Sequence, residues 1–205
     1  MTKKTLVALT AAACGMLAYP ASAQQQTPWL LRARVLNMAP ANKSDPIGGA
    51  GESDRLSVAS KTFPELDISY FFTPHIAAEL VLTYPQKHDV MLDGAKIGSF
   101  KHLPPTLLAQ YHFLPGGKFD PYLGAGVNYT RISSVDLLGG AGGMDSSSVG
   151  LALQGGVDFK IDQTWSINLD VKKVRIRSDI TAAGTKISNV QVDPLLISVG
   201  VGYRF

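Results

Sequence analysis

The chain ends in Leu195-Leu-Ile-Ser-Val-Gly-Val-Gly-Tyr-Arg-Phe205, where large apolar side chains occupy every second position. These positions are Leu195, Ile197, Val199, Val201, Tyr203 and Phe205. Leu196 and otherwise serine, glycine or arginine lie between them, and this period of two is that of a β-strand with one apolar face. A tilted strand crosses a hydrocarbon layer in about 9–11 residues, and aromatic residues favour the boundary between lipid and water. The segment therefore predicts a strand of a transmembrane β-barrel.

The first 23 residues have the pattern of a cleaved secretory signal peptide. Lys3 and Lys4 precede an apolar stretch over residues 5–19, and Ala21-Ser22-Ala23 is a small-residue cleavage site. The stretch is short for a retained membrane anchor. Lipoprotein processing at Cys14 is the other alternative, but the three alanines before it match a lipobox poorly. We expect a signal at 1–23 and one barrel domain at 24–205.

Composition narrows the class of protein further. The only cysteine, Cys14, lies in the predicted signal, so no internal disulfide is expected. Two of the 19 basic residues also lie there, which leaves 17 against 16 acidic residues and a net charge of +1. The chain contains no basic patch of the kind that would indicate nucleic-acid binding. After residue 23 no apolar run reaches the length of a spanning helix, while 45% hydrophobic residues and 20 glycines suit a β-rich chain.

Seven further segments show alternation of the same kind. Together with the last strand, the expected strands are 29–39, 61–72, 76–85, 106–113, 121–132, 149–160, 165–172 and 195–205. Three connections are short turns, whereas four are long and polar, near 40–60, 86–105, 133–148 and 178–190. Short turns at one end and long loops at the other are typical of outer-membrane barrels. The fold class predicted is all-β: an eight-stranded antiparallel transmembrane β-barrel with short periplasmic turns and long extracellular loops.

Two details of the pattern refine this prediction. Most aromatic residues at strand ends map to the periplasmic rim, whereas Tyr84 and Tyr129 map to the outer rim. Beyond Lys172 the apolar residues move to the other face of the strand: Val174 and Ile176 occupy the even-numbered positions and alternate with arginines. A β-bulge or the membrane boundary is expected near 172–173.

The direction of the first strand follows from energy. An arginine pointing into lipid costs roughly 2–4 kcal/mol near the midplane, so Arg32 and Arg34 must face the lumen. The same argument places a charged floor in the lumen toward the periplasm, formed by Arg32, Arg34, Asp67, Asp158, Lys160, Asp170, Lys172 and Arg204. This floor is either a self-neutralising plug that holds the barrel together or a barrier to straight flow through a conducting lumen.

Apolar side chains also point inward. The predicted apolar lining is Leu36, Met38, Phe71, Val81, Leu108 and Leu196, with Phe71 near the periplasmic end and the others in the middle to outer half. An eight-stranded barrel has room for filling side chains or one small ligand. The lining is therefore either ordinary core packing or an apolar entry funnel above the charged floor.

Other signals carry little chemistry. Six prolines near the outer strand ends, Pro40, Pro64, Pro85, Pro104, Pro105 and Pro194, indicate strand termination or a lateral gate. His88 and His102 share one loop without further metal-ligand types in a suitable pattern. No nucleophile elbow accompanies His112. We expect no enzyme activity, no catalytic or metal site and no cofactor.

Three motifs go beyond generic barrel patterning: residues 102–111 (HLPPTLLAQY), residues 121–130 (PYLGAGVNYT), and Val192-Asp-Pro194 leading into Gly202-Tyr-Arg-Phe205. Together they resemble the OmpW family of small outer-membrane barrels. The resemblance implies eight strands and a narrow, largely hydrophobic lumen that passes small apolar molecules across the outer membrane with lateral release into the bilayer. Phe205 resembles the terminal signal by which assembly machinery recognises such barrels.

The sequence thus leads to two functional hypotheses. The first is a hydrophobic channel for passive uptake of small apolar molecules, and the second is a non-transporting structural or adhesion barrel that acts through its extracellular loops. The expected location is the cell outer membrane. The expected partners are outer-membrane lipid and lipopolysaccharide, the barrel-assembly machinery and small hydrophobic molecules.

Overall fold

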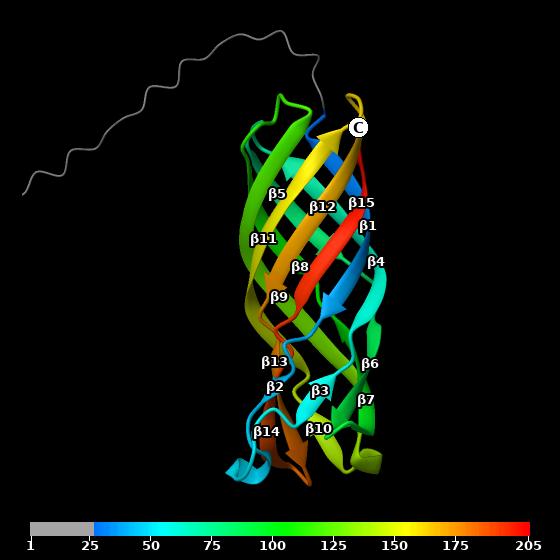
Figure 1. The fold of residues 1–205 in the computed structure, drawn as a ribbon, viewed down its shortest axis with the longest axis vertical. Helices are drawn as coiled ribbons and strands as arrows, with labels where there is room; N and C mark the ends of the chain where they lie inside the picture. The colour runs from blue at the N-terminus through cyan, green and yellow to red at the C-terminus, as the bar shows by residue number, and fades with distance from the viewer. Residues whose placement is uncertain (1–26) are drawn as a thin grey trace, which may run out of the picture.

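The computed structural model describes residues 27–205, so the signal peptide predicted at 1–23 lies outside the described residues. Eight long strands form the barrel: β1 (Trp29–Ala39), β4 (Lys61–Phe71), β5 (Ile76–Leu82), β8 (Thr106–His112), β9 (Phe119–Leu137), β11 (Ser147–Lys160), β12 (Trp165–Val174) and β15 (Leu195–Arg204). Each pairs antiparallel with the next, and β15 returns to β1. The predicted eight-stranded antiparallel barrel is confirmed (Figure 1).

The closing pair shows how the alternation of the sequence becomes a wall. Leu30 pairs with Arg204 and Ala39 with Leu195, in one unbroken register. In β15, Val199 and Val201 are about half exposed on the outside of the barrel, whereas Ser198, on the other face of the same strand, is buried. Strand β15 pairs with β1 on one side and with β12 on the other, so the barrel has no free edge where its ends meet.

Aromatic side chains form a belt around the outside of the end that carries the C-terminus, drawn at the top of Figure 1. Trp29 packs edge-to-face on Tyr70 with ring centroids 4.9 Å apart, and Trp165 packs in the same way on Tyr203. Phe205 continues the second pair and is 59% exposed. Such rings favour the lipid–water boundary, so this end is the periplasmic rim that the sequence predicts.

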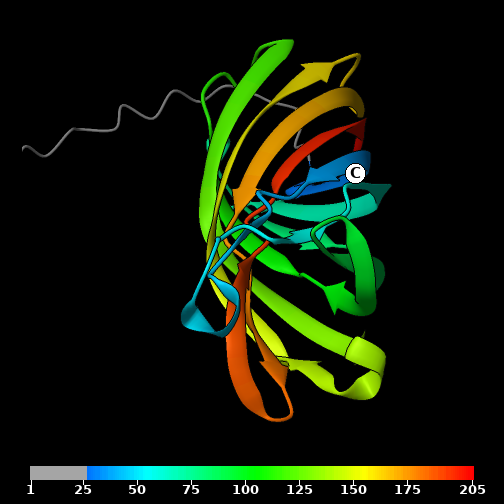
Figure 2. The ribbon, with the colours of Figure 1, turned by 60° about the horizontal axis from the view of Figure 1, so that its bottom comes forward.

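The long segments predicted as loops are largely β-structure that prolongs the wall beyond the membrane (Figure 2). The added strands are β2 (Lys43–Ser44), β3 (Leu56–Val58), β6 (Gln86–Leu92), β7 (Ala95–Leu103), β10 (Gly142–Met144), β13 (Arg177–Ala182) and β14 (Thr185–Gln191). Two short 3-10 turns, η1 (Ile47–Gly49) and η2 (Leu138–Gly140), lie among them. We call this part the outer extension.

The interior of the outer extension explains why it folds. Its buried side chains form one apolar cluster: Leu56, Val58, Val81, Val90, Phe100, Leu108, Ile132, Leu137, Ala152, Val174, Ile176, Ile180, Val190 and Val192. Hairpin β6–β7 turns at Asp93 and Gly94, both at positive φ, which is the geometry of a tight hairpin. Residues 27–205 contain no helix long and apolar enough to cross a membrane.

Strand β12 resolves the two alternatives for residues 172–173. Its ladders with β11 and β15 keep one register through Lys173, so the strand has no bulge there. Lys172 and Val174 are both buried, and Lys173 between them is exposed. The strand therefore continues unchanged while the polarity of its two faces exchanges, which is the pattern expected at a membrane boundary.

Candidate functional site

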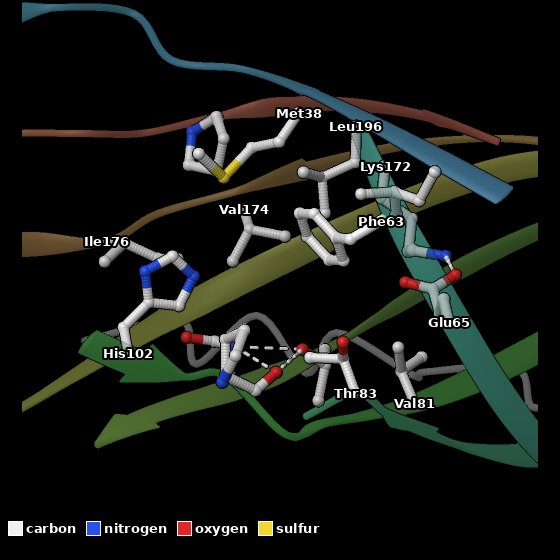
Figure 3. A pocket seen from close by; sticks show the side chains of 15 residues that line it. Met38, Phe63, Glu65, Val81, Thr83, His102, Lys172, Val174, Ile176 and Leu196 are labelled. Carbon is white, nitrogen blue, oxygen red and sulfur yellow. Dashed lines mark hydrogen bonds and ion pairs between the residues drawn. The ribbon is translucent and has the colours of Figure 1, made fainter. Parts of the chain in front are cut away.

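A cavity lies inside the barrel, at the level where the membrane-spanning wall meets the outer extension (Figure 3). Its lining comes from Leu36, Met38, Phe63, Glu65, Val81, Thr83, His102, Pro104, Thr106, Asn128, Lys172, Val174, Ile176, Pro194 and Leu196. The cavity volume is about 30 Å³. This holds one or two water molecules, whereas roughly 150 Å³ accommodates benzene. An organic ligand would therefore have to displace side chains, and the flexible Met38 is suited to that.

The structure brings four of the six predicted apolar lining residues together. Leu36, Met38, Val81 and Leu196 line the cavity. The other two lie elsewhere: Leu108 is buried in the outer apolar cluster, and Phe71 packs with Leu30 and Ala77 near the periplasmic end.

The cavity wall also contains residues that the sequence analysis did not select. Phe63 is buried against Leu36 and Met38. Val174 faces inward because β12 keeps its register to its end, and Ile176, just beyond the strand, is buried on the same side. Continuing the alternation of each strand past the membrane boundary predicts all three. His102 is the fourth, and Figure 3 shows its ring pointing toward Ile176 and Val174.

A buried network of ion pairs closes the lumen on the periplasmic side of the cavity. Arg32 binds Asp158 through two hydrogen bonds of 2.6 and 3.2 Å. Its remaining amino group donates to Glu79 at 2.7 Å and to Ser69 at 3.0 Å. The guanidinium is completely buried, so these contacts replace its hydration.

Arg34 and Lys172 extend this network upward to the cavity floor. Arg34 lies 2.8 Å from a carboxylate oxygen of Asp67. Lys172 donates to Glu65 at 2.7 Å and to Asp170 at 2.9 Å. Since Glu65 and Lys172 also line the cavity, its floor is a charged pair, below a wall of mostly apolar side chains that also includes Thr83, His102, Thr106 and Asn128.

Several predicted floor residues belong to this plug and two lie apart from it. Arg32, Arg34, Asp67, Asp158, Asp170 and Lys172 are within it. Lys160 is only partly buried and donates to the carbonyl of Pro115, while the Arg204 guanidinium lies 4.1 Å from the ring centre of Phe71. Both are thus at the periplasmic mouth.

The plug also contains partners that sequence reasoning placed elsewhere or omitted. Glu65 and Glu79 face inward by strand alternation but at heights that the sequence separates from the floor; both are ion-paired within the plug. Tyr122 was not selected, yet its hydroxyl donates to Asp170 at 2.8 Å and accepts from Arg34 at 3.2 Å. Gln154 donates to both Glu79 and Asp170 at 2.8 Å. Strand alternation identifies these as inward-facing, but strand tilt decides which heights coincide.

The barrel wall beside the cavity has a weak seam. The ladder between β4 and β5 ends at Leu66 and Leu82, and over Lys61–Glu65 strand β4 pairs only with β1. Thr83 donates to the carbonyl of Pro64 at 3.1 Å, so the proline nitrogen, which carries no proton, faces the seam as well. The other five prolines of the set lie between strands.

A groove of about 530 Å³ lies on the outer surface over this seam, lined by Ala33, Arg34, Val35, Pro64, Glu65, Leu66, Leu82, Thr83 and Tyr84. Glu65 and Thr83 line both this groove and the cavity inside. At the seam, therefore, a single layer of side chains separates the lumen from the outside of the barrel.

Histidines and carboxylates do not form a metal centre among residues 27–205: no group of three or more metal-ligand side chains lies together there. His88 and His102 do meet, but as parallel stacked rings with centroids 4.6 Å apart.

Comparisons with known proteins agree with this architecture. The model of the OmpW family matches residues 25–205. Outer-membrane protein y4mB of Sinorhizobium fredii is 42% identical over 186 residues, covering 87% of this chain and 80% of the relative. PahQ of Pseudomonas aeruginosa, named as a dibenzothiophene metabolism operon protein, is 27% identical over 219 residues and covers both chains fully. The crystal structure of outer membrane protein OprG from Pseudomonas aeruginosa matches with a TM-score of 0.76 at 30% identity, covering 88% of this chain and 97% of that one.

Proposed function

The chain belongs to the OmpW family of outer-membrane proteins, and on this premise we propose that it is a passive channel that admits small apolar molecules and releases them sideways into the bilayer. The observation that carries the proposal is the apolar cavity whose floor is a sealed ion network. A molecule that reaches the cavity meets buried charges below it, and an apolar molecule is poorly accommodated among them.

The lateral exit is supported by the seam. Beside the cavity the wall lacks the β4–β5 ladder, and the side chains of Glu65 and Thr83 border both the cavity and the outer groove. Opening this wall requires the Thr83 to Pro64 hydrogen bond and side-chain packing to be lost, but no ladder of backbone hydrogen bonds. Tyr84 beside the groove lies at the predicted outer rim, so the exit faces lipid.

The chemical class of cargo has separate support. The cavity wall is largely aliphatic, with Leu36, Met38 and Val174 among its residues. The relative PahQ is named for an operon that metabolises dibenzothiophene, an apolar aromatic compound. We infer a comparable class of cargo here, taken up down its concentration gradient.

A reversible disulfide across the seam tests the proposal. Pro64→Cys with Tyr84→Cys joins the two sides, because the β4–β5 register continued past Leu66 and Leu82 sets these outward-facing positions opposite each other. Residues 27–205 hold no native cysteine to interfere. Cells lacking other barrels of this family would be given naphthalene, and its uptake followed by fluorescence. With the disulfide formed, uptake should fall to the level of cells without the barrel, and a reductant should restore it.

The matched control is a disulfide elsewhere in the wall. Leu169→Cys with Val199→Cys links a directly paired position of the continuous β12–β15 ladder, away from the groove, and should leave uptake unchanged. Uptake that persists through the oxidised seam variant would contradict lateral release. If the parent barrel takes up naphthalene no faster than cells without it, the channel itself is contradicted.

The alternative function, a structural or adhesion barrel, gives the opposite pattern. It predicts that a charged residue at Val81 or Leu108, in a barrel that still folds, has no consequence, whereas removal of residues 133–148 does. A channel predicts slower naphthalene uptake from the Val81 variant, because Val81 lines the cavity.

A further inference from the structure

Next to the cavity, the inner face of hairpin β6–β7 carries a glutamine and two histidines beside the apolar cluster of the outer extension. Gln86 pairs directly across the ladder with His102, and His88 is the next inward residue on β6. The rings of His88 and His102 stack at 6° to one another. Gln86 is 0% and His88 2% exposed. Of the three, His102 lines the cavity, and Gln86 and His88 lie directly behind its ring.

Two acceptor atoms in this cluster have no partner. Among the residues that the structure describes, Gln86 Oε1 and His88 Nε2 are buried without a hydrogen bond. The amide nitrogen of Gln86 is satisfied by the carbonyl of Tyr84 at 3.1 Å. A buried polar atom left without a partner is costly, and most such atoms in native proteins are paired.

Other polar side chains of the cavity lining are paired. Asn128 donates to Thr106 at 2.9 Å and to the carbonyls of Pro104 and Pro105 at 3.2 Å. Thr130 in turn donates to Asn128 at 2.6 Å.

Elsewhere among the described residues, the buried side-chain atoms without a hydrogen bond are the two carboxylate oxygens of Asp67, which lies in the ion network, and the hydroxyl of Ser198 on β15. In the outer extension, the unpaired atoms are those of Gln86 and His88.

Because both histidines are neutral, the unpaired ring nitrogen of His88 is an acceptor. Burial, aided by the charge of Lys61, lowers the pKa of His88 to about 4. Burial, the charge of His88 and then that of Lys61 lower the pKa of His102 to about 3. Both lie in the outer extension and are neutral at pH 7. The His88 ring also hydrogen-bonds the backbone of Ala59, which occupies its one N–H and leaves Nε2 with a free lone pair.

We propose that Gln86 Oε1 and His88 Nε2 are the polar recognition point of the cavity, and that the preferred cargo is an apolar molecule with one hydrogen-bond donor, such as a phenol or an alcohol. This rests on the proposed channel function and specifies its substrate class. A site built around buried acceptors favours ligands that donate to them, because an analogue without the donor leaves the acceptors unpaired. The rest of the cavity wall accommodates the apolar part of the molecule.

A metal ion fits the cluster less well. Stacked parallel rings direct their nitrogen lone pairs side by side rather than toward a common point, and described residues offer no third histidine, cysteine or carboxylate nearby. A resident water molecule is the other occupant that the acceptors could take, and the experiment must separate it from cargo.

The direct test uses nitrogen NMR of the purified barrel in lipid nanodiscs with 15N-labelled histidine. Phenol is compared with toluene, which has the same shape and no donor, and with anisole, which has an oxygen but cannot donate. Phenol should shift the His88 Nε2 resonance, whereas toluene and anisole should not. His75 and His112, far from the cavity in β5's turn and in β8, serve as internal references. An Nε2 resonance that ignores phenol, as it would with a tightly held water, overturns the proposal.

A variant supplies an independent measurement. His88→Phe keeps a ring against His102 and removes the acceptor, so phenol affinity should fall about three- to tenfold while toluene affinity changes less than twofold. His75→Phe, at the exposed periplasmic rim, should change neither. Equal losses for phenol and toluene would indicate a packing effect and contradict the proposal. Since binding is measured on purified protein, this outcome is separate from failure of the seam test, which concerns transport in cells.

Discussion

Arg32 shows how strongly a single side chain of this barrel depends on its neighbours. The sequence predicts its direction, because the lumen is the only place where an arginine in mid-strand avoids lipid. It does not predict its partners. Asp158 is 126 positions away, and Glu79 comes from another strand. Their meeting depends on strand tilt and on the inward room left by neighbours such as Gly156, whose absent side chain is replaced by the Tyr122 ring.

The first prediction concerns this residue. Arg32→Met removes one side of a buried ion network, leaves Asp158 without its ion pair and leaves Glu79 with only the longer contact to Arg34 at 3.6 Å, so the free energy of unfolding should fall by about 3–5 kcal/mol. Urea unfolding of the barrel in lipid vesicles, followed by tryptophan fluorescence, measures it. Lys118→Met, at an exposed periplasmic turn, should change the value by less than about 0.5 kcal/mol. A loss below about 1 kcal/mol for Arg32→Met would show that the plug does not hold the barrel together.

At the scale of the element, β12 marks the point where sequence reasoning stopped too early. Before Lys172 the apolar side chains of this strand point outward. After it they point inward, and this exchange resembles a break in the strand when only the sequence is considered. The register in fact continues, and only the surroundings change from lipid to water. The sequence did contain a signal for hairpin β6–β7, the dipeptide Asp93-Gly94, which is typical of two-residue turns. The short apolar stretches in the four long connections do not by themselves indicate that these connections close over one core.

The same hairpin should be sensitive to acid. His88 and His102 have pKa values of about 4 and 3 in the folded hairpin, below their ordinary value of 6.5. Between about pH 6.5 and 4 an opened hairpin binds protons that the closed one does not, so stability is lost as the pH falls. Each such histidine contributes about 1.4 kcal/mol per pH unit within this range.

Hydrogen exchange of the β6 and β7 amides, expressed as protection relative to intrinsic rates, should therefore decrease from pH 7 to pH 5, while β1 and β15 stay protected. A double variant, His88→Phe with His102→Phe, should abolish the change. Protection that is equal at both pH values in the parent barrel would show that the stacked pair is not what couples the hairpin to pH.

On the scale of the whole molecule, the chain consists of a membrane barrel joined to an outer extension along continuous strands such as β9 and β11 (Figure 1). Strand number, closure and orientation follow from alternation and loop length. The cavity does not follow from them, because its walls come from the outer ends of the strands, next to segments that the sequence predicts as loops. The exposed apolar band and the aromatic belt at its periplasmic edge determine where the molecule sits in the membrane.

This arrangement gives a prediction for orientation. Single cysteines at Gly94, in the β6–β7 turn, and at Gly116, in a short turn of the opposite end, are far apart along the barrel axis. In intact cells a membrane-impermeant maleimide should label Gly94→Cys and spare Gly116→Cys. Permeabilising the outer membrane should make both react. Labelling of Gly116→Cys in intact cells would contradict the periplasmic position of the short turns.

The height of the seam has a consequence for what this barrel accomplishes. The ladder ends above Leu66 and Leu82, beside Tyr84, and thus near the outer face of the hydrocarbon layer. In the proposed channel, cargo leaving there would enter the outer leaflet, with most of the bilayer still to cross by its own solubility in lipid. The task of such a channel would be to provide a detour around the polar outer surface of the membrane, and the rate of entry beyond it would be governed by partitioning between lipid and water.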